Sequence, residues 1–90
     1  MIQLVVRHQV ADFEKWHGFF KRFAAMRARY GVRSEQVFQS TDDPCNVTLI
    51  HSFDRLEDIQ AIVTSPEIQA AIAEAGVVGA PSFWTVKSVD

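Results

Sequence analysis

The sequence predicts a single α+β domain, in which helices cover one face of a four-stranded antiparallel sheet. Four segments have the composition and alternation of strands, and two have the spacing of helices. They follow one another as strand, helix, strand, strand, helix, strand. The chain has 90 residues, of which 48% are hydrophobic and 11% aromatic, and this length suits one small core. We therefore expect residues 1–90 to form one domain.

The first strand is predicted over residues 2–10, where side chains alternate with a two-residue period. Asp12 then stands where a helix N-cap belongs, because its carboxylate can accept from the free amides of a first turn. The alternation places Ile2, Leu4 and Val6 on one face of this strand and Gln3, Val5 and Arg7 on the other.

Residues 13–30 predict one helix with an apolar face roughly 160° wide, and Gly31 is placed to end it. Arg27 falls in the middle of this apolar face, where a charge has to be paired. We expect its guanidinium to reach an acid such as Asp54 or a carbonyl. The alternative is that Arg27 anchors an anion or a carbonyl at the mouth of a pocket.

Residues 32–40 and 46–53 predict two strands of a hairpin, joined by the turn TDDPCN. A second helix is expected to start at Asp54, because Asp54 and Glu57 form a D-x-x-E start signal. Ser65 and Pro66 form another start signal, so this helix is predicted in two pieces that end at Gly76. Residues 78–81 are expected to be a loop, and residues 82–88 the last strand.

This order of elements resembles the ferredoxin-like fold, with sheet order 4-1-3-2. The helices would cover one face only, and the other face is expected to be partly apolar. We therefore expect a homodimer that packs through its sheets, as a dimeric α/β barrel. Trp84 is the strongest single candidate for a contact or a pocket wall at that face.

Three motifs extend the resemblance to the dimeric α/β-barrel superfamily, which includes the antibiotic-biosynthesis monooxygenase-like proteins. The chain is also similar to a set of small uncharacterised proteins that carry the same motifs. They read Val10-Ala11-Asp12 with Trp16, Asp42-Asp43-Pro44-Cys45-Asn46, and Ser65-Pro66-Glu67 followed by Ala75-Gly76-Val77-Val78-Gly79-Ala80-Pro81.

The resemblance implies a small-molecule-binding protein that takes a small apolar or aromatic ligand. It is consistent with a cofactor-independent monooxygenase or cyclase acting on an aromatic or polyketide-like compound, and whether the chain is an enzyme stays open. The alternative is a non-enzymatic homodimeric module with no ligand site. Haem-degrading relatives have a histidine ligand in the second helix, where this chain has Gln69-Ala70-Ala71-Ile72, so we expect no haem and no other cofactor.

The candidate ligand-binding residues are taken from the strands and the first helix, and no catalytic residue is assigned. His8 and His51 would lie about 13 Å apart at ~3.3 Å per residue along neighbouring strands, too far to share a metal within one subunit. Each is more often a hydrogen-bonded, half-buried histidine than a catalyst. His8, Asp12 and His17 lack a spacing that would gather them around a metal. The candidates are Arg7, His8, Arg27, His51 and Trp84.

Composition argues against several other classes of protein. Residues 1–33 are basic and residues 34–90 acidic, which we read as two helices that attract each other rather than as a nucleic-acid patch. No apolar run approaches the length of a membrane span, and the N-terminus lacks the pattern of a secretory signal. Cys45 is the single cysteine, and we expect it to be an exposed thiol. We predict a cytoplasmic protein without nucleic-acid or membrane partners.

Overall fold

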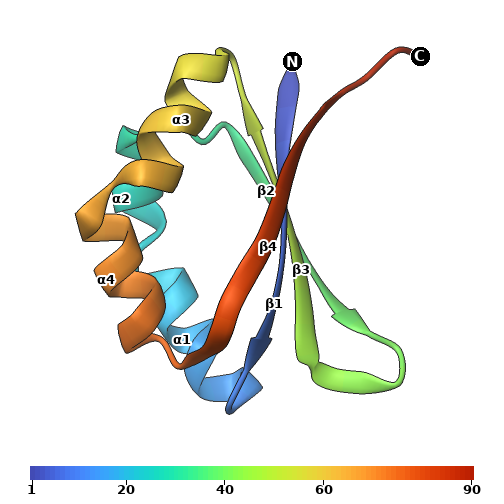
Figure 1. Ribbon diagram of the computed structural model, residues 1–90, viewed down its shortest axis with the longest axis vertical. Helices are drawn as coiled ribbons and strands as arrows, with labels where there is room; N and C mark the ends of the chain where they lie inside the picture. Colours follow the sequence, from blue (N-terminus) through green and yellow to red (C-terminus); the bar gives the residue numbers. More distant parts are fainter.

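The computed structural model describes residues 1–90 and has the predicted ferredoxin-like order of elements (Figure 1). Its antiparallel sheet has the strand order β2-β3-β1-β4, which is the predicted 4-1-3-2 order counted from the other edge. All the helices lie on one side of the sheet (Figure 1). The elements are β1 (Ile2–Val10), α1 (Phe13–Arg22), α2 (Ala24–Arg29), β2 (Ser34–Ser40), β3 (Asp43–Phe53), α3 (Leu56–Thr64), α4 (Pro66–Glu74) and β4 (Val77–Lys87).

The strand register fixes which side chains face the helices, because neighbours across a sheet point to the same side. Leu4 pairs with His51, and Val6 pairs with both Leu49 and Phe83. These residues form rows on the helix-covered face. The opposite face carries the other alternate set, in rows that include Gln36, Ile50, Val5 and Trp84. The predicted assignment of Leu4 and Val6 to the helix side is confirmed.

The first helix is interrupted at Phe23, whereas the sequence predicted one helix over residues 13–30. Phe23 has ψ of 14°, outside the helical range, and its amide bonds to the carbonyl of Phe19 at 3.2 Å. Asp12 caps α1 as predicted, since its side chain accepts from the amide of Lys15. Gly31 follows α2 with a φ of 98°, a conformation that favours glycine.

Asp54 does not cap the following helix, so this part of the prediction is wrong. The N-cap of α3 is Arg55, which makes no side-chain capping bond. The Asp54 carboxylate instead accepts from Arg33 Nε at 2.9 Å, which removes it from the helix end. The second predicted start is confirmed, because Ser65 accepts from the amide of Ile68 and Pro66 begins α4.

Both β3 and β4 are longer than the sequence predicted. β3 begins at Asp43 and contains Pro44, which lies beyond the last pairing with β1 at Asn46 and so removes no hydrogen bond there. β4 includes the residues 78–81 that were expected to be a loop. The pairing with β1 shifts within this stretch, where Gly79 has a φ of 73°, so the segment is a bulged strand.

The buried apolar core is divided into two clusters. One lies under α3 and consists of Leu4, Phe53, Ile59 and Ile62. The other lies under α1 and consists of Val10, Trp16, Val47 and Leu49. Val6 packs against both clusters and lies between them on the sheet. The core is therefore packed as two separate regions rather than one.

The longest helix has ten residues, and none has the length and hydropathy required to cross a membrane.

Candidate functional site

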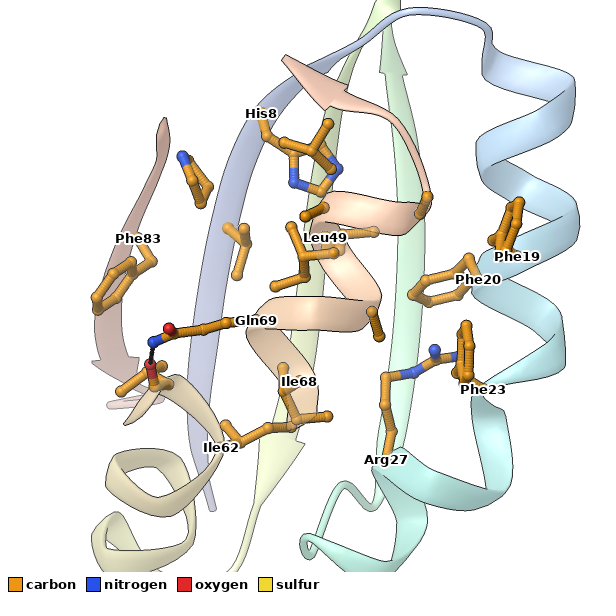
Figure 2. A pocket seen from close by; sticks show the side chains of 18 of the residues that line it. His8, Phe19, Phe20, Phe23, Arg27, Leu49, Ile62, Ile68, Gln69 and Phe83 are labelled. Carbon is orange, nitrogen blue, oxygen red and sulfur yellow. Dashed lines mark hydrogen bonds between the residues drawn. The ribbon is translucent and has the colours of Figure 1, made fainter. Parts of the chain in front are cut away.

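A cavity of about 510 Å³ lies between the helix layer and the sheet (Figure 2). Its volume falls within the range typical of small-molecule sites. Strand residues Leu4, Val6 and Leu49 form its floor, and helices supply the walls. Eighteen of the 24 lining residues are hydrophobic, so the cavity suits a mostly apolar ligand.

Aromatic side chains from the first helical segment line one wall. Figure 2 shows Phe19, Phe20 and Phe23 extending from the same helical segment beside the cavity. Phe20 also stacks on Trp16, with ring centroids 5.1 Å apart. Such a wall offers flat faces that pack well against an aromatic ring.

His8 lies at one end of the cavity and has no partner for either ring nitrogen. Its residue exposure is 7%, and both Nδ1 and Nε2 are buried without a hydrogen bond. Its ring and that of Trp16 form a T-shaped pair, with centroids 5.5 Å apart. Burial lowers the pKa of His8, because a charged imidazole would lose its hydration there. The neutral ring thus has one donor and one acceptor without a partner inside the chain.

Arg27, Glu35 and His51 form a buried polar chain at the opposite end. Arg27 Nε contacts Glu35 Oε2, and its Nη2 donates to Oε1 at 3.4 Å. Glu35 Oε2 also lies 3.2 Å from His51 Nδ1. The guanidinium stacks over Phe20, 3.7 Å from the ring centroid. Desolvation lowers the pKa of His51 to about 4 although the negative charge of Glu35 opposes this change, so the ring is neutral near pH 7.

Arg27 pairs with an acid, as expected, but Asp54, the acid named as an example, is not that partner. Asp54 pairs with Arg33, and the acid that meets Arg27 is Glu35. Glu35 reaches this position because it pairs with His51 across the β2–β3 ladder and shares its helix-facing side. The charge of Arg27, which lies in the apolar face of the first helical segment, is therefore neutralised inside the domain.

Three of the five candidate residues line one cavity, and two do not. His8, Arg27 and His51 line the cavity. Arg7 and Trp84 lie on the uncovered face of the sheet, away from the cavity. Arg7 Nε there donates to the side-chain oxygen of Asn46.

The histidines do not gather around a common point. His8 lies opposite Val47 and His51 opposite Leu4, which separates them by four residues along the ladder. His17 stacks on Phe13, and no group of three or more potential metal ligands forms. Cys45 is half-buried rather than exposed and packs beside the cluster that contains Trp16.

Glu35, Phe20 and Gln69 line or support the site but were not among the sequence candidates. Glu35 was identifiable, because an acid at a helix-facing strand position needs a cation and Arg27 is the cation in the facing apolar stripe. Phe20 was identified only as an apolar helix residue. Gln69 enters the cavity wall from α4, where its side chain donates to the carbonyl of Val63, and no sequence pattern marked it.

No protein-family profile matches the sequence, and no curated protein matches it. Solved structures do share its fold. SnoaB, a cofactor-independent oxygenase from Streptomyces nogalater, has a TM-score of 0.74 at 16% identity, covering 98% of this chain and 94% of that chain.

Two further similar structures are provisionally assigned antibiotic biosynthesis monooxygenases. The protein from Bordetella bronchiseptica has a TM-score of 0.84 at 14% identity and covers 98% of this chain and 96% of its own. The protein from Caulobacter crescentus has a TM-score of 0.76 at 19% identity, with 99% and 90% covered. The chain thus has the fold of the antibiotic biosynthesis monooxygenase-like proteins, as its motifs predicted.

Proposed function

We propose that this chain, which has the fold of the antibiotic biosynthesis monooxygenase-like proteins, binds a flat aromatic compound between its helices and its sheet. The observation that carries the proposal is the 510 Å³ apolar cavity with the unpartnered, buried ring of His8 at one end. An unbonded buried polar group is costly unless a ligand group completes it. A ring system with an oxygen substituent supplies both the apolar contact and that bond.

We further propose that the reaction is a cofactor-independent oxygenation of a phenolic, polyketide-like compound. SnoaB, described as a cofactor-independent oxygenase, has the same fold. In this reaction a ring CH2 group and O2 become a ring carbonyl and water. The substrate gives up two hydrogens and four electrons, one oxygen atom enters the carbonyl, and the other leaves as water.

Binding is tested with 1,8-dihydroxyanthraquinone, the product of oxidising the corresponding anthrone. Trp16 lines the cavity, and in a Trp84→Phe background it is the sole tryptophan. We expect saturable quenching of its fluorescence at one ligand per chain.

The matched variants are two alanines of α4. Ala71 lines the cavity and Ala70 does not, so Ala71→Phe fills space that Ala70→Phe leaves free. We expect Ala71→Phe to weaken binding by about tenfold or more, equal to roughly 1.4 kcal/mol, and Ala70→Phe to bind like the parent. Equal loss in both variants, or no binding by the parent, would overturn the proposed site.

Oxygenation is tested with 1,8-dihydroxyanthrone in an oxygen electrode. We expect O2 uptake and anthraquinone formation in a one-to-one ratio, faster than the spontaneous reaction and slowed by Ala71→Phe. Binding without faster O2 uptake would reject the oxygenase and favour a non-enzymatic binding protein.

We also propose that two copies pack through the uncovered faces of their sheets. Large apolar side chains are exposed there, including Trp84 at 47%, Phe38 at 46% and Val86 at 40%. Exposed apolar area of this kind is typical of an interface. Association would also cover much surface that a 90-residue chain leaves open.

A further inference from the structure

At the polar end of the cavity, a histidine lies beside a carboxylate that is itself paired with an arginine. Glu35 and His51 are cross-strand neighbours on the helix-facing side of the sheet. Arg27 reaches them from α2 and contacts both oxygens of Glu35. The side chains of Arg27 and His51 are buried, and Glu35 is largely so.

The position of Glu35 selects one form of the neutral imidazole. A neutral ring has one N–H group, and a carboxylate can only accept a hydrogen bond. Glu35 Oε2 lies 3.2 Å from His51 Nδ1, so an N–H group at Nδ1 would meet the carboxylate, whereas a lone pair there would face its negative charge. The proton therefore belongs on Nδ1, which leaves the lone pair on Nε2.

The lone pair on Nε2 is free to act on a ligand. His51 lines the cavity, and Glu35 lies beside its other nitrogen, Nδ1. Phe20 from α1 packs near the ring and Leu4 is its cross-strand neighbour on β1, and neither side chain competes for a proton. Arg27 and Glu35 are the charged groups that face it.

We propose that His51 is the base of this site and that Glu35, held by Arg27, is its positioning residue. This inference rests on the proposed function and narrows the substrate to a phenolic compound with an enolisable ring CH2 group. The C–H bond breaks, the proton forms an Nε2–H bond, and the electron pair stays on the ring as an enolate. The imidazolium is stabilised by Glu35, and the enolate is the species that O2 oxidises.

The first test reads the tautomer of His51 directly in the unmodified protein. Two-bond ¹H–¹⁵N NMR spectra of ¹⁵N-histidine-labelled protein at pH 7 should show His51 protonated on Nδ1. In Glu35→Gln the amide can donate to Nδ1, so we expect the ring to switch to the Nε2–H form. A wild-type His51 that carries its proton on Nε2 would overturn the proposal without any variant.

The second test separates proton removal from oxygenation. Under anaerobic conditions in D2O, the protein should accelerate deuterium exchange into the CH2 group of 1,8-dihydroxyanthrone. We expect His51→Gln to reduce this acceleration by about 100-fold, the usual contribution of a general base, and Glu35→Gln to reduce it less. His17→Gln is the matched control, because His17 does not line the cavity.

The outcomes distinguish the two proposals. If His51→Gln binds 1,8-dihydroxyanthraquinone normally and exchanges at the wild-type rate, His51 is not the base, although the cavity remains a ligand site. Normal binding with slow exchange supports the base. Absence of binding by the wild type would overturn the proposed function and this inference together.

Discussion

His8 and His51 show how single residues in this cavity depart from ordinary behaviour. Both are buried, and in both the loss of hydration is the largest cause of a lowered pKa. Neither ring has its hydrogen bonds completed within the chain. Unbonded buried rings lower the stability of a fold. Perturbed groups of this kind cluster at functional sites, and both of these histidines line the cavity.

The lowered pKa of His51 predicts that the domain loses stability in mild acid. Between pH 6.5 and about 4 the unfolded chain binds a proton at this residue and the folded chain does not, so acid favours unfolding. The loss from pH 7 to 4 is on the order of 2–3 kcal/mol for His51, and His8 adds to it in the same direction.

Urea unfolding at pH 7 and pH 4.5 measures this effect. His51→Gln cannot titrate in this range and should show a smaller difference between the two pH values. Equal pH dependence in the wild type and in His51→Gln would show that the ring does not titrate as described.

At the scale of elements, Ser65 joins two parts of the helix layer. Its hydroxyl accepts from the amide of Ile68 at the start of α4 and lies 2.6 Å from the Tyr30 hydroxyl after α2. One small side chain thus sets the break between α3 and α4 and links it to the first helical segment. α4, which begins at this contact, supplies part of the cavity wall.

Replacing Ser65 should destabilise the domain more than replacing Tyr30. Ser65→Ala removes the cap and leaves the Tyr30 hydroxyl without its partner, for a loss of about 1–2 kcal/mol. Tyr30→Phe removes only the link between the two hydroxyls. Thermal unfolding followed by circular dichroism gives both values, and an equal loss in the two variants would assign the stability to the link rather than to the cap.

The elements were largely predictable because their signals are local. Asp12, Ser65 and Pro66 act within one helical turn, and the sequence placed them correctly. Asp54 was misassigned because a distant partner, Arg33, takes its carboxylate. The strand character of residues 78–81 comes from pairing with β1, which overrides the glycine and proline that predicted a loop.

The site was less predictable, because it depends on register and on space. His8, Arg27 and His51 were identified as unusual, but that they share a cavity follows from the helix-facing register and from the space left between helices and sheet. Glu35 required the β2–β3 pairing to be known. A cavity has no sequence signal of its own, since it is formed by what side chains fail to fill.

At the scale of the whole molecule, the two faces of the sheet have different roles in our proposals. The helix-covered face holds the cavity, and the uncovered face carries Trp84 beside Val5 in the same cross-strand row. A change at Trp84 therefore alters association without entering the cavity.

We expect Trp84→Glu to convert a dimer into a monomer, because the interface would then bury an unpaired charge. Val89→Glu is the control, since Val89 is 84% exposed beyond the last strand. Sedimentation velocity at micromolar concentration measures both, and a wild-type monomer would contradict the interface.

The division of the core into two clusters also affects how the molecule responds to compression. A folded chain with an unfilled interior occupies more volume than its unfolded form with the surrounding water, and the difference grows with the internal void. Any part of the cavity that excludes water therefore makes this domain more sensitive to hydrostatic pressure than a fully packed domain of equal length. A ligand seated between the clusters removes that excess volume, so occupancy makes the domain resistant to pressure as well as more stable.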